Sequence, residues 1–156
     1  MPQISGRPRP TGRVAVLVSR YNELVTGRLL EGALAACREA GVPEADVDVC
    51  WVPGAFELGA AASAAATTGR YACLVALGAV VRGDTPHFDF VAGEAARALS
   101  DVAVRHAMPV AFGVLTVDTM QQALDRAGGS AGNKGHEATS AALELADLIR
   151  QLRQGP

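Results

Sequence analysis

The sequence lacks the features that mark membrane, secreted and metal-binding chains. No apolar run approaches the roughly 18 residues that cross a bilayer, and the first residues, MPQISGRPRPTGR, have no apolar core for a signal peptide. The three cysteines, Cys37, Cys50 and Cys73, form no CxxC pair and no cluster with histidine. We therefore expect a cytoplasmic protein that spans no membrane, keeps its thiols reduced and binds no metal.

Runs of one charge are also missing. The net charge is only -2, and acidic and basic residues are interspersed, which argues against a nucleic-acid partner and favours a small-molecule one. At 156 residues the chain is long enough for one domain and has no internal repeat. Because Pro2, Pro8 and Pro10 fall in residues 1–12, we expect a flexible N-terminal arm followed by a single domain over residues 13–156.

Apolar segments without polar alternation predict strands that are buried on both faces of a parallel sheet. These segments are residues 14–19, 47–52, 71–81 and 109–115. Segments with apolar residues at helical spacing alternate with them, at residues 23–39, 56–68, 86–106, 120–127 and 135–152. The alternation predicts a flavodoxin-like, three-layer α/β/α sandwich with a four-stranded parallel sheet. The edges of so small a sheet favour pairing with another subunit.

Polar and aromatic residues follow the predicted strands at the carboxyl edge of the sheet, where ligands bind in such folds. They are Arg20, Tyr21 and Asn22 after the first strand, residues 53–57 after the second, and residues 83–87 after the third. Each group alone could be ordinary loop chemistry, with Asn22 a helix cap and Phe56 a core residue. Together they offer an aromatic face, a carboxylate, an anion site and a proton carrier.

The stretch from Ala72 to Asp89 organises this edge, because a buried strand there leads through Gly83 into a helix. Thr85 and Pro86 predict the N-cap and the first helical residue. Backbone amides and the helix dipole at such a junction favour an anion, and His87 in the first turn could exchange protons with it. His106 and His136 are expected to be solvent-exposed helix residues without such a role.

Two nucleotide-binding patterns are absent. The segment GAVVRGDT resembles a P-loop, but Asp84 stands where the lysine would be, and no G-x-G-x-x-G follows the first strand. A carboxylate at that place would repel a nucleotide's phosphates. A single phosphate held by backbone amides remains compatible with the segment.

Two cations stand near the glycine-rich residues 128–135. Lys134 is the only lysine among 14 Lys and Arg residues, which suggests that a compact point charge is needed there. Arg126 could supply a second cation for a phosphate dianion. A flexible connector and a solvated helix end explain the same residues, and the sequence leaves both interpretations open.

With these residues in view, the chain resembles the 6,7-dimethyl-8-ribityllumazine synthase family of riboflavin biosynthesis over residues 13–152. Five blocks carry the resemblance: SRYNE at 19–23, VPGAFE at 52–57, ALGAVVRGDTPHFDFV at 76–91, PVAFGVLTVDT at 109–119 and DRAGGSAGNKG at 125–135. The implied reaction condenses 5-amino-6-(D-ribitylamino)uracil with 3,4-dihydroxy-2-butanone 4-phosphate and releases phosphate and water. It needs no cofactor.

The resemblance also implies roles for single residues. Tyr21 would stack on the pyrimidine ring, where the family has Phe or Trp, and His87 would donate and accept protons. The other implied contacts are Asn22 beside the ring, Ala55, Phe56 and Glu57 along the ribityl chain, Ala79, Val80 and Val81 on the pyrimidine, and Gly83, Asp84 and Thr85 on the phosphate. Phe112 and Arg126 would complete the pocket from a neighbouring subunit, Arg126 on the phosphate and Phe112 against the ring, and Lys134 matches a lysine near it.

The family's assemblies are pentamers, decamers or sixty-subunit shells, so the resemblance implies at least a homopentamer, with riboflavin synthase as a further partner. Pro8 and Pro10 would weaken the N-terminal strand that joins subunits in the shells, and Ser130 stands where many shell-forming members carry lysine. Whether this chain forms a sixty-subunit shell is therefore left undecided by the sequence. A non-catalytic flavin- or pteridine-binding protein and a shell without catalysis are the alternatives, and His87 together with Arg126 favours the enzyme.

Overall fold

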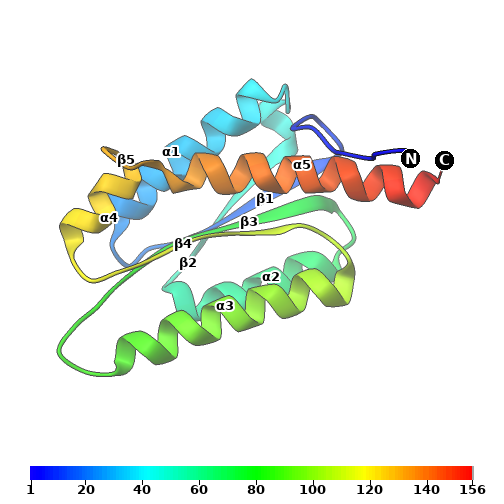
Figure 1. Cartoon of the computed structure of the whole chain (residues 1–156). Helices are drawn as coiled ribbons and strands as arrows, with labels where there is room; N and C mark the ends of the chain where they lie inside the picture. The colour runs from blue at the N-terminus through cyan, green and yellow to red at the C-terminus, as the bar shows by residue number, and fades with distance from the viewer. Residues whose placement is uncertain (156) are drawn as a thin grey trace.

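Four strands form one parallel sheet in the order β2-β1-β3-β4 in a computed structural model that describes residues 1–155 (Figure 1). They are β1 (Arg13–Ser19), β2 (Val47–Val52), β3 (Tyr71–Val81) and β4 (Val110–Val117). In register, Val16 of β1 pairs with Val49 of β2 on one side and with Val75 of β3 on the other. The predicted four-stranded parallel sheet is confirmed.

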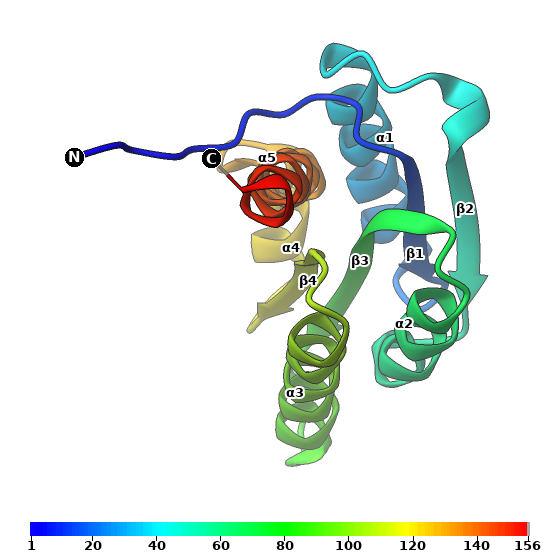
Figure 2. The same ribbon diagram turned by 90° about the vertical axis from the view of Figure 1, so that its right-hand side faces the viewer.

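Helices cover both faces of this sheet, which gives the three layers predicted from the sequence (Figure 2). The helices are α1 (Glu23–Glu39), α2 (Leu58–Thr67), α3 (His87–His106), α4 (Met120–Arg126) and α5 (Lys134–Gln154). Core residues from α1, α4 and α5 pack on one face, and core residues from α2 and α3 pack on the other. Within residues 1–155, no helix is both long and apolar enough to cross a membrane.

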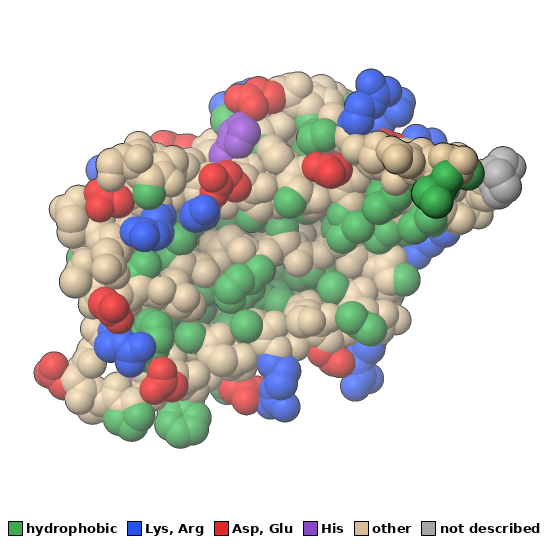
Figure 3. All heavy atoms as spheres, in the orientation of Figure 1, with side chains coloured by type: hydrophobic (Ala, Val, Ile, Leu, Met, Phe, Trp, Pro, Cys, Tyr) green, Lys and Arg blue, Asp and Glu red, His purple; other side chains and the backbone are tan. Residues whose placement is uncertain are grey.

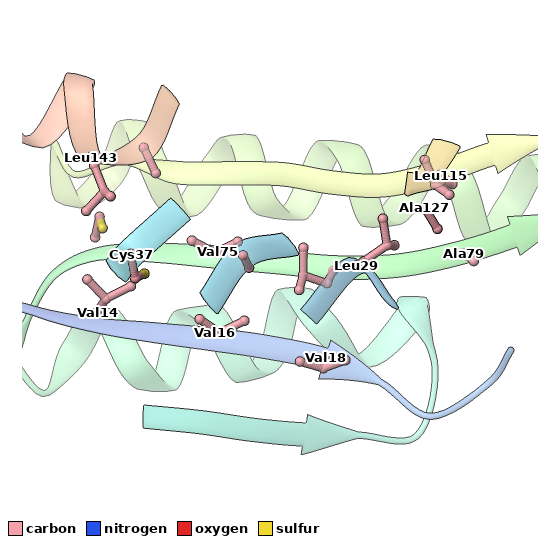
Figure 4. Close-up of a cluster of buried hydrophobic side chains, with 14 of the residues drawn as sticks. Val14, Val16, Val18, Leu29, Cys37, Val75, Ala79, Leu115, Ala127 and Leu143 are labelled. Atoms are coloured by element: carbon pink, nitrogen blue, oxygen red, sulfur yellow. The ribbon is translucent and has the colours of Figure 1, made fainter. Parts of the chain in front are cut away.

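Strand β1 shows why these segments are apolar throughout. Val14, Val16 and Val18 point to the layer of α1 and α5, where they meet residues such as Leu29 (Figure 4). The residues between them, including Leu17, point to α2 and α3. Both faces are thus removed from water, and each fully buried Leu or Val contributes roughly 1.5–3 kcal/mol to folding.

The junction of α1 and α5 depends on small residues. A Cβ atom on Gly135 would collide with the Leu29 carbonyl of α1, so only glycine allows this close crossing. Asn133 joins α1 and α5 at the same junction. Its side-chain oxygen caps α5 by accepting the Gly135 amide at 2.9 Å. Its amide group donates to the Arg28 carbonyl at 3.0 Å.

Two predicted segments differ from the structure. The glycine-rich residues expected as a plain loop contain a short antiparallel pair, β5 (Ala127–Gly129) and β6 (Gly132–Asn133). Gly128 and Gly132 have φ angles of 95° and 82°, which favour glycine, and they permit the tight reversal. The second predicted helix begins as a 3₁₀ turn, η2 (Ala55–Glu57), before α2, and another 3₁₀ turn, η1 (Glu44–Asp46), precedes β2.

The start of α3 also lies one residue later than expected. Pro86 has ψ of 3° and occupies the N-cap position, so His87 is the first helical residue. The prediction of Thr85 as N-cap is therefore wrong, although its hydroxyl accepts the His87 amide at a long 3.4 Å. The φ of Pro86, -69°, suits a helix, but its ψ is not helical, and this delays the start of α3 by one residue.

Residues 1–12 form no helix or strand, and part of this arm lies along α5. Asp147, only 1% exposed, accepts the Arg7 amide at 3.0 Å and pairs with Arg150 at 2.7 Å. Gln151 donates to the Ser5 carbonyl at 2.9 Å. The first residues then extend away from the sandwich (Figure 2). The flexibility of the arm and the boundary at residue 13 stay predictions.

Candidate functional site

A cavity of about 500 Å³ opens at the carboxyl ends of β1, β2 and β3. Parallel strands deliver the residues that follow them to one edge, which is why distant sequence groups meet there. The predicted residues in its wall are Tyr21, Asn22, Ala55, Phe56, Glu57, Ala79, Val80, Val81 and His87. The cavity thus brings together one part of the predicted site.

Two of the predicted residues that line this first cavity are exposed aromatic side chains, which we call its aromatic rim. Tyr21 is 69% exposed and Phe56 is 61% exposed. Gly54 permits the arrangement, since a Cβ atom there would lie 2.6 Å from Cδ2 of the Tyr21 ring and 3.2 Å from a carboxylate oxygen of Glu57. The site therefore offers flat apolar surfaces beside one acceptor group, a combination that suits a heterocycle carrying hydroxyls.

Asn22 joins two of the contributing elements. It stands in the left-handed region with φ of 62° and ψ of 46°, at the N-cap position of α1, but its side chain makes no cap hydrogen bond. Instead, its amide group donates to the Ala79 carbonyl of β3 at 2.9 Å. The side chain thus fixes the distance between the ends of β1 and β3, which a simple helix cap would not do.

His87 lies in the first turn of α3, in the wall of the cavity, and is exposed. An exposed imidazole beside a cavity can take protons from a bound molecule and return them. Phe90 and Val91 also line the cavity and were not predicted. Their spacing of three and four residues from His87 places them on the same helix face, and this was the signal available in the sequence.

The predicted phosphate residues do not line this cavity. Gly83, Asp84 and Thr85 are exposed and lie in the connection between Val81 and His87, both of which do line it. The loop therefore connects two residues of the cavity wall but does not itself line the cavity.

A second cavity, of about 440 Å³, contains the remaining predicted residues. Phe112 of β4, Arg126 of α4 and Lys134 of α5 all line it, and no residue lines both cavities. Lys134 pairs with Glu137 at 2.8 Å, and Arg126 donates to the Gln122 carbonyl at 3.1 Å. Hydrophobic side chains gather beside it in the groove between α5 and α3 (Figure 3). Within one chain, the two parts of the predicted site do not meet.

Comparison with known proteins places the chain in a family. The family model of 6,7-dimethyl-8-ribityllumazine synthase matches residues 11–150. A protein named 6,7-dimethyl-8-ribityllumazine synthase from Edwardsiella ictaluri (strain 93-146) is 49% identical over 145 residues, which is 92% of this chain and 93% of that protein. The chain belongs to this family.

Membership confirms the resemblance seen in five sequence blocks. Most of the site residues that the resemblance implies line the two cavities of about 500 and 440 Å³. A cavity of similar volume, about 510 Å³, lies beside Tyr71, His106 and Met108 at the opposite end of the sheet. None of the predicted residues lines it. Ligands of doubly wound sheets bind at the carboxyl ends of strands, where the first cavity opens.

Neither a metal site nor a reactive thiol accompanies these cavities in the part of the chain that the structure describes. Over residues 1–155, no group of three His, Cys, Asp or Glu side chains is placed to hold a metal ion. Burial raises the pKa of Cys73 to about 12, so its thiol stays protonated and unsuited to nucleophilic attack.

Proposed function

We propose that this chain catalyses the condensation of 5-amino-6-(D-ribitylamino)uracil with 3,4-dihydroxy-2-butanone 4-phosphate to 6,7-dimethyl-8-ribityllumazine, with release of phosphate and water. This is the penultimate step of riboflavin synthesis. One observation carries the proposal: in this member of the lumazine synthase family, the aromatic rim, Glu57 and His87 all line the first cavity.

The reaction suits these groups. The amine of the pyrimidine adds to the ketone carbonyl, and the adduct loses water to form an imine. Loss of the neighbouring C–H proton expels phosphate and leaves an enol, which tautomerises to a new ketone. The ribityl-bearing amine adds to this ketone, and loss of a second water completes the ring. Such steps proceed in water without a cofactor, so the main work of the protein is to hold two reactants together and to move protons. His87 is the proton carrier in this proposal.

The pyrimidine occupies the first cavity. Its ring lies against Tyr21, with Asn22 beside it and the backbone of Ala79, Val80 and Val81 along its polar edge. The ribityl chain runs past Ala55 and Phe56, and the Glu57 carboxylate accepts hydrogen bonds from its hydroxyls. Phe90 and Val91 add apolar wall on the side of His87.

The phosphate of the second reactant lies between Gly83, Asp84 and Thr85 of one chain and Arg126 and Lys134 of a neighbour. Two cations suit a dianion. Phe112 of the neighbour closes the pocket against the ring. The separation of the two cavities within one chain supports this arrangement.

The active form is therefore a homo-oligomer. We propose a homopentamer, with a sixty-subunit shell as the larger alternative and riboflavin synthase as the enzyme that consumes the product. Native mass spectrometry distinguishes five chains from sixty. Free cysteines support a reducing, cytoplasmic location.

The test mixes the purified chain with both reactants and follows lumazine fluorescence and phosphate release. We expect acceleration over the uncatalysed condensation, with one phosphate released for each lumazine formed. An uncatalysed rate in the presence of the chain would overturn the proposal and favour a non-catalytic flavin or pteridine binder.

A further inference from the structure

The connection between β3 and α3 has few anchors of its own. Its exposed residues Gly83, Asp84 and Thr85 leave open space around them, and a Cβ atom added to Gly83 would meet no atom within 4 Å. Its first residue, Arg82, donates its backbone amide to the Val117 carbonyl at 2.8 Å. Contacts from residues outside 83–85 must therefore fix the position of this loop.

The side chain of Arg82 supplies that connection. Its Nε atom donates to the Asp118 carboxylate, just past the end of β4, at 2.9 Å. The guanidinium carbon lies 4.3 Å from the centre of the Phe88 ring, and a terminal nitrogen lies 3.8 Å from the Asp89 carboxylate. Phe88 and Asp89 belong to the first turn of α3, so one guanidinium joins the end of β4 to the helix turn that carries His87.

Charge gives Arg82 a second effect on the loop. Asp84, Asp89 and Asp118 put three carboxylates on or beside a loop that, on the proposed function, receives a phosphate. The guanidinium contacts Asp89 and Asp118 and offsets their repulsion of a dianion. Because these groups are exposed, the ion pairs contribute little to the free energy of unfolding, and their effect is expected to be local.

We propose that Arg82 is a positioning residue for the phosphate-binding half of the site. It does not line the cavity with His87. It acts by holding residues 83–86 and the first turn of α3 at a fixed spacing and by neutralising the neighbouring carboxylates. This inference rests on the proposed function and assigns a role to a residue outside the set predicted from the sequence.

The first test compares Arg82→Gln with Arg82→Lys, which keeps the charge but not the planar fork. For Arg82→Gln we expect the KM for the butanone phosphate to rise roughly tenfold, while the KM for the pyrimidine changes less than about twofold. Arg82→Lys should recover part of the loss. Arg97→Gln is the matched control, because Arg97 lies further along α3 and pairs with Glu94 at 2.6 Å.

The second test needs no turnover. Two amides at the ends of the loop are hydrogen-bonded, that of Arg82 to the Val117 carbonyl and that of Asp89 to the Pro86 carbonyl. Their hydrogen exchange should become roughly tenfold faster in Arg82→Gln than in the unaltered chain and stay unchanged in Arg97→Gln. An unchanged KM for the butanone phosphate, or unchanged exchange, would overturn the role of Arg82. Absence of acceleration by the unaltered chain would instead overturn the proposed function, and the exchange measurement alone would then decide whether Arg82 holds the loop.

Discussion

Single side chains give the two cavities different chemistry. Tyr21, Phe56 and Phe90 provide flat apolar surface in the first cavity. Arg126 and Lys134 bring positive charge to the second. Aromatic surface stabilises a bound heterocycle, and charge-assisted hydrogen bonds stabilise a bound phosphate. We therefore expect the pyrimidine to contact the first cavity and the phosphate of the second reactant to contact the cations of the second cavity.

Replacement of Arg126 tests that division at the scale of a residue. We expect Arg126→Ala to raise the KM for the butanone phosphate by roughly one to two orders of magnitude, because the dianion loses a charge-assisted hydrogen bond. The affinity for the pyrimidine, measured by titration calorimetry, should change far less. Arg38→Ala, at an exposed position in the last turn of α1, is the control. Equal losses for both reactants would contradict the assignment.

At the scale of elements, the close crossing of α1 and α5 holds the layer that carries Lys134. Gly135→Ala places a methyl group against the Leu29 carbonyl, and we expect a loss of about 2 kcal/mol in the free energy of unfolding from urea titration. Gly27→Ala in α1 is the control, since no atom lies within 4 Å of its added Cβ. Alanine there should be neutral or stabilising, because it raises helix propensity. Equal stability of the two variants would contradict the close approach.

The attachment of the arm to α5 is a second property of elements. Arg150, and also the Arg7 amide, hold the pKa of Asp147 below its usual range. A carboxyl with a lowered folded-state pKa stabilises the fold above its unfolded pKa of about 3.9 and loses this contribution as the pH falls through the folded value. We expect Asp147→Asn to have a lower Tm than the unaltered chain at neutral pH, with the difference vanishing in acid.

Amide exchange locates that effect. In Asp147→Asn the Arg7 amide loses its carboxylate acceptor and should exchange faster at neutral pH, whereas Glu31→Gln, at an exposed position of α1, should leave it unchanged. A Tm difference that persisted at all pH values would contradict the role of the Asp147 charge.

Most elements follow from periodicity in the sequence. Helix α1 spans the predicted residues 23–39, and buried strands such as β1 read as uninterrupted apolar runs because both of their faces are covered. The β5 and β6 pair gave no such signal, since its glycines have no side chains to alternate. Phe90 and Val91 could have been found from their spacing to His87, but spacing alone does not show which face of a helix lines a cavity.

At the scale of the whole molecule, strand order decides how the site is divided. Patterns in the sequence identify β4 as a strand, and only the assembled sheet shows that it forms an edge, with Phe112 in a different cavity from His87. The family resemblance supplied the expectation that these residues act from a neighbour. Exposed apolar side chains over β4 and the aromatic rim of the first cavity are the surfaces that such a neighbour would cover.

The most direct test of this account is activity in mixed assemblies. One parent is the Glu57→Ala/His87→Ala variant, which damages the first cavity, and the other is Arg126→Ala, which damages the second. Each alone should be strongly impaired. When the two are refolded together, about one site in four combines two intact halves if adjacent chains share each site, so activity should rise well above that of either parent. No gain on mixing, in assemblies shown to contain both chains, would contradict a site that is completed by a neighbouring subunit.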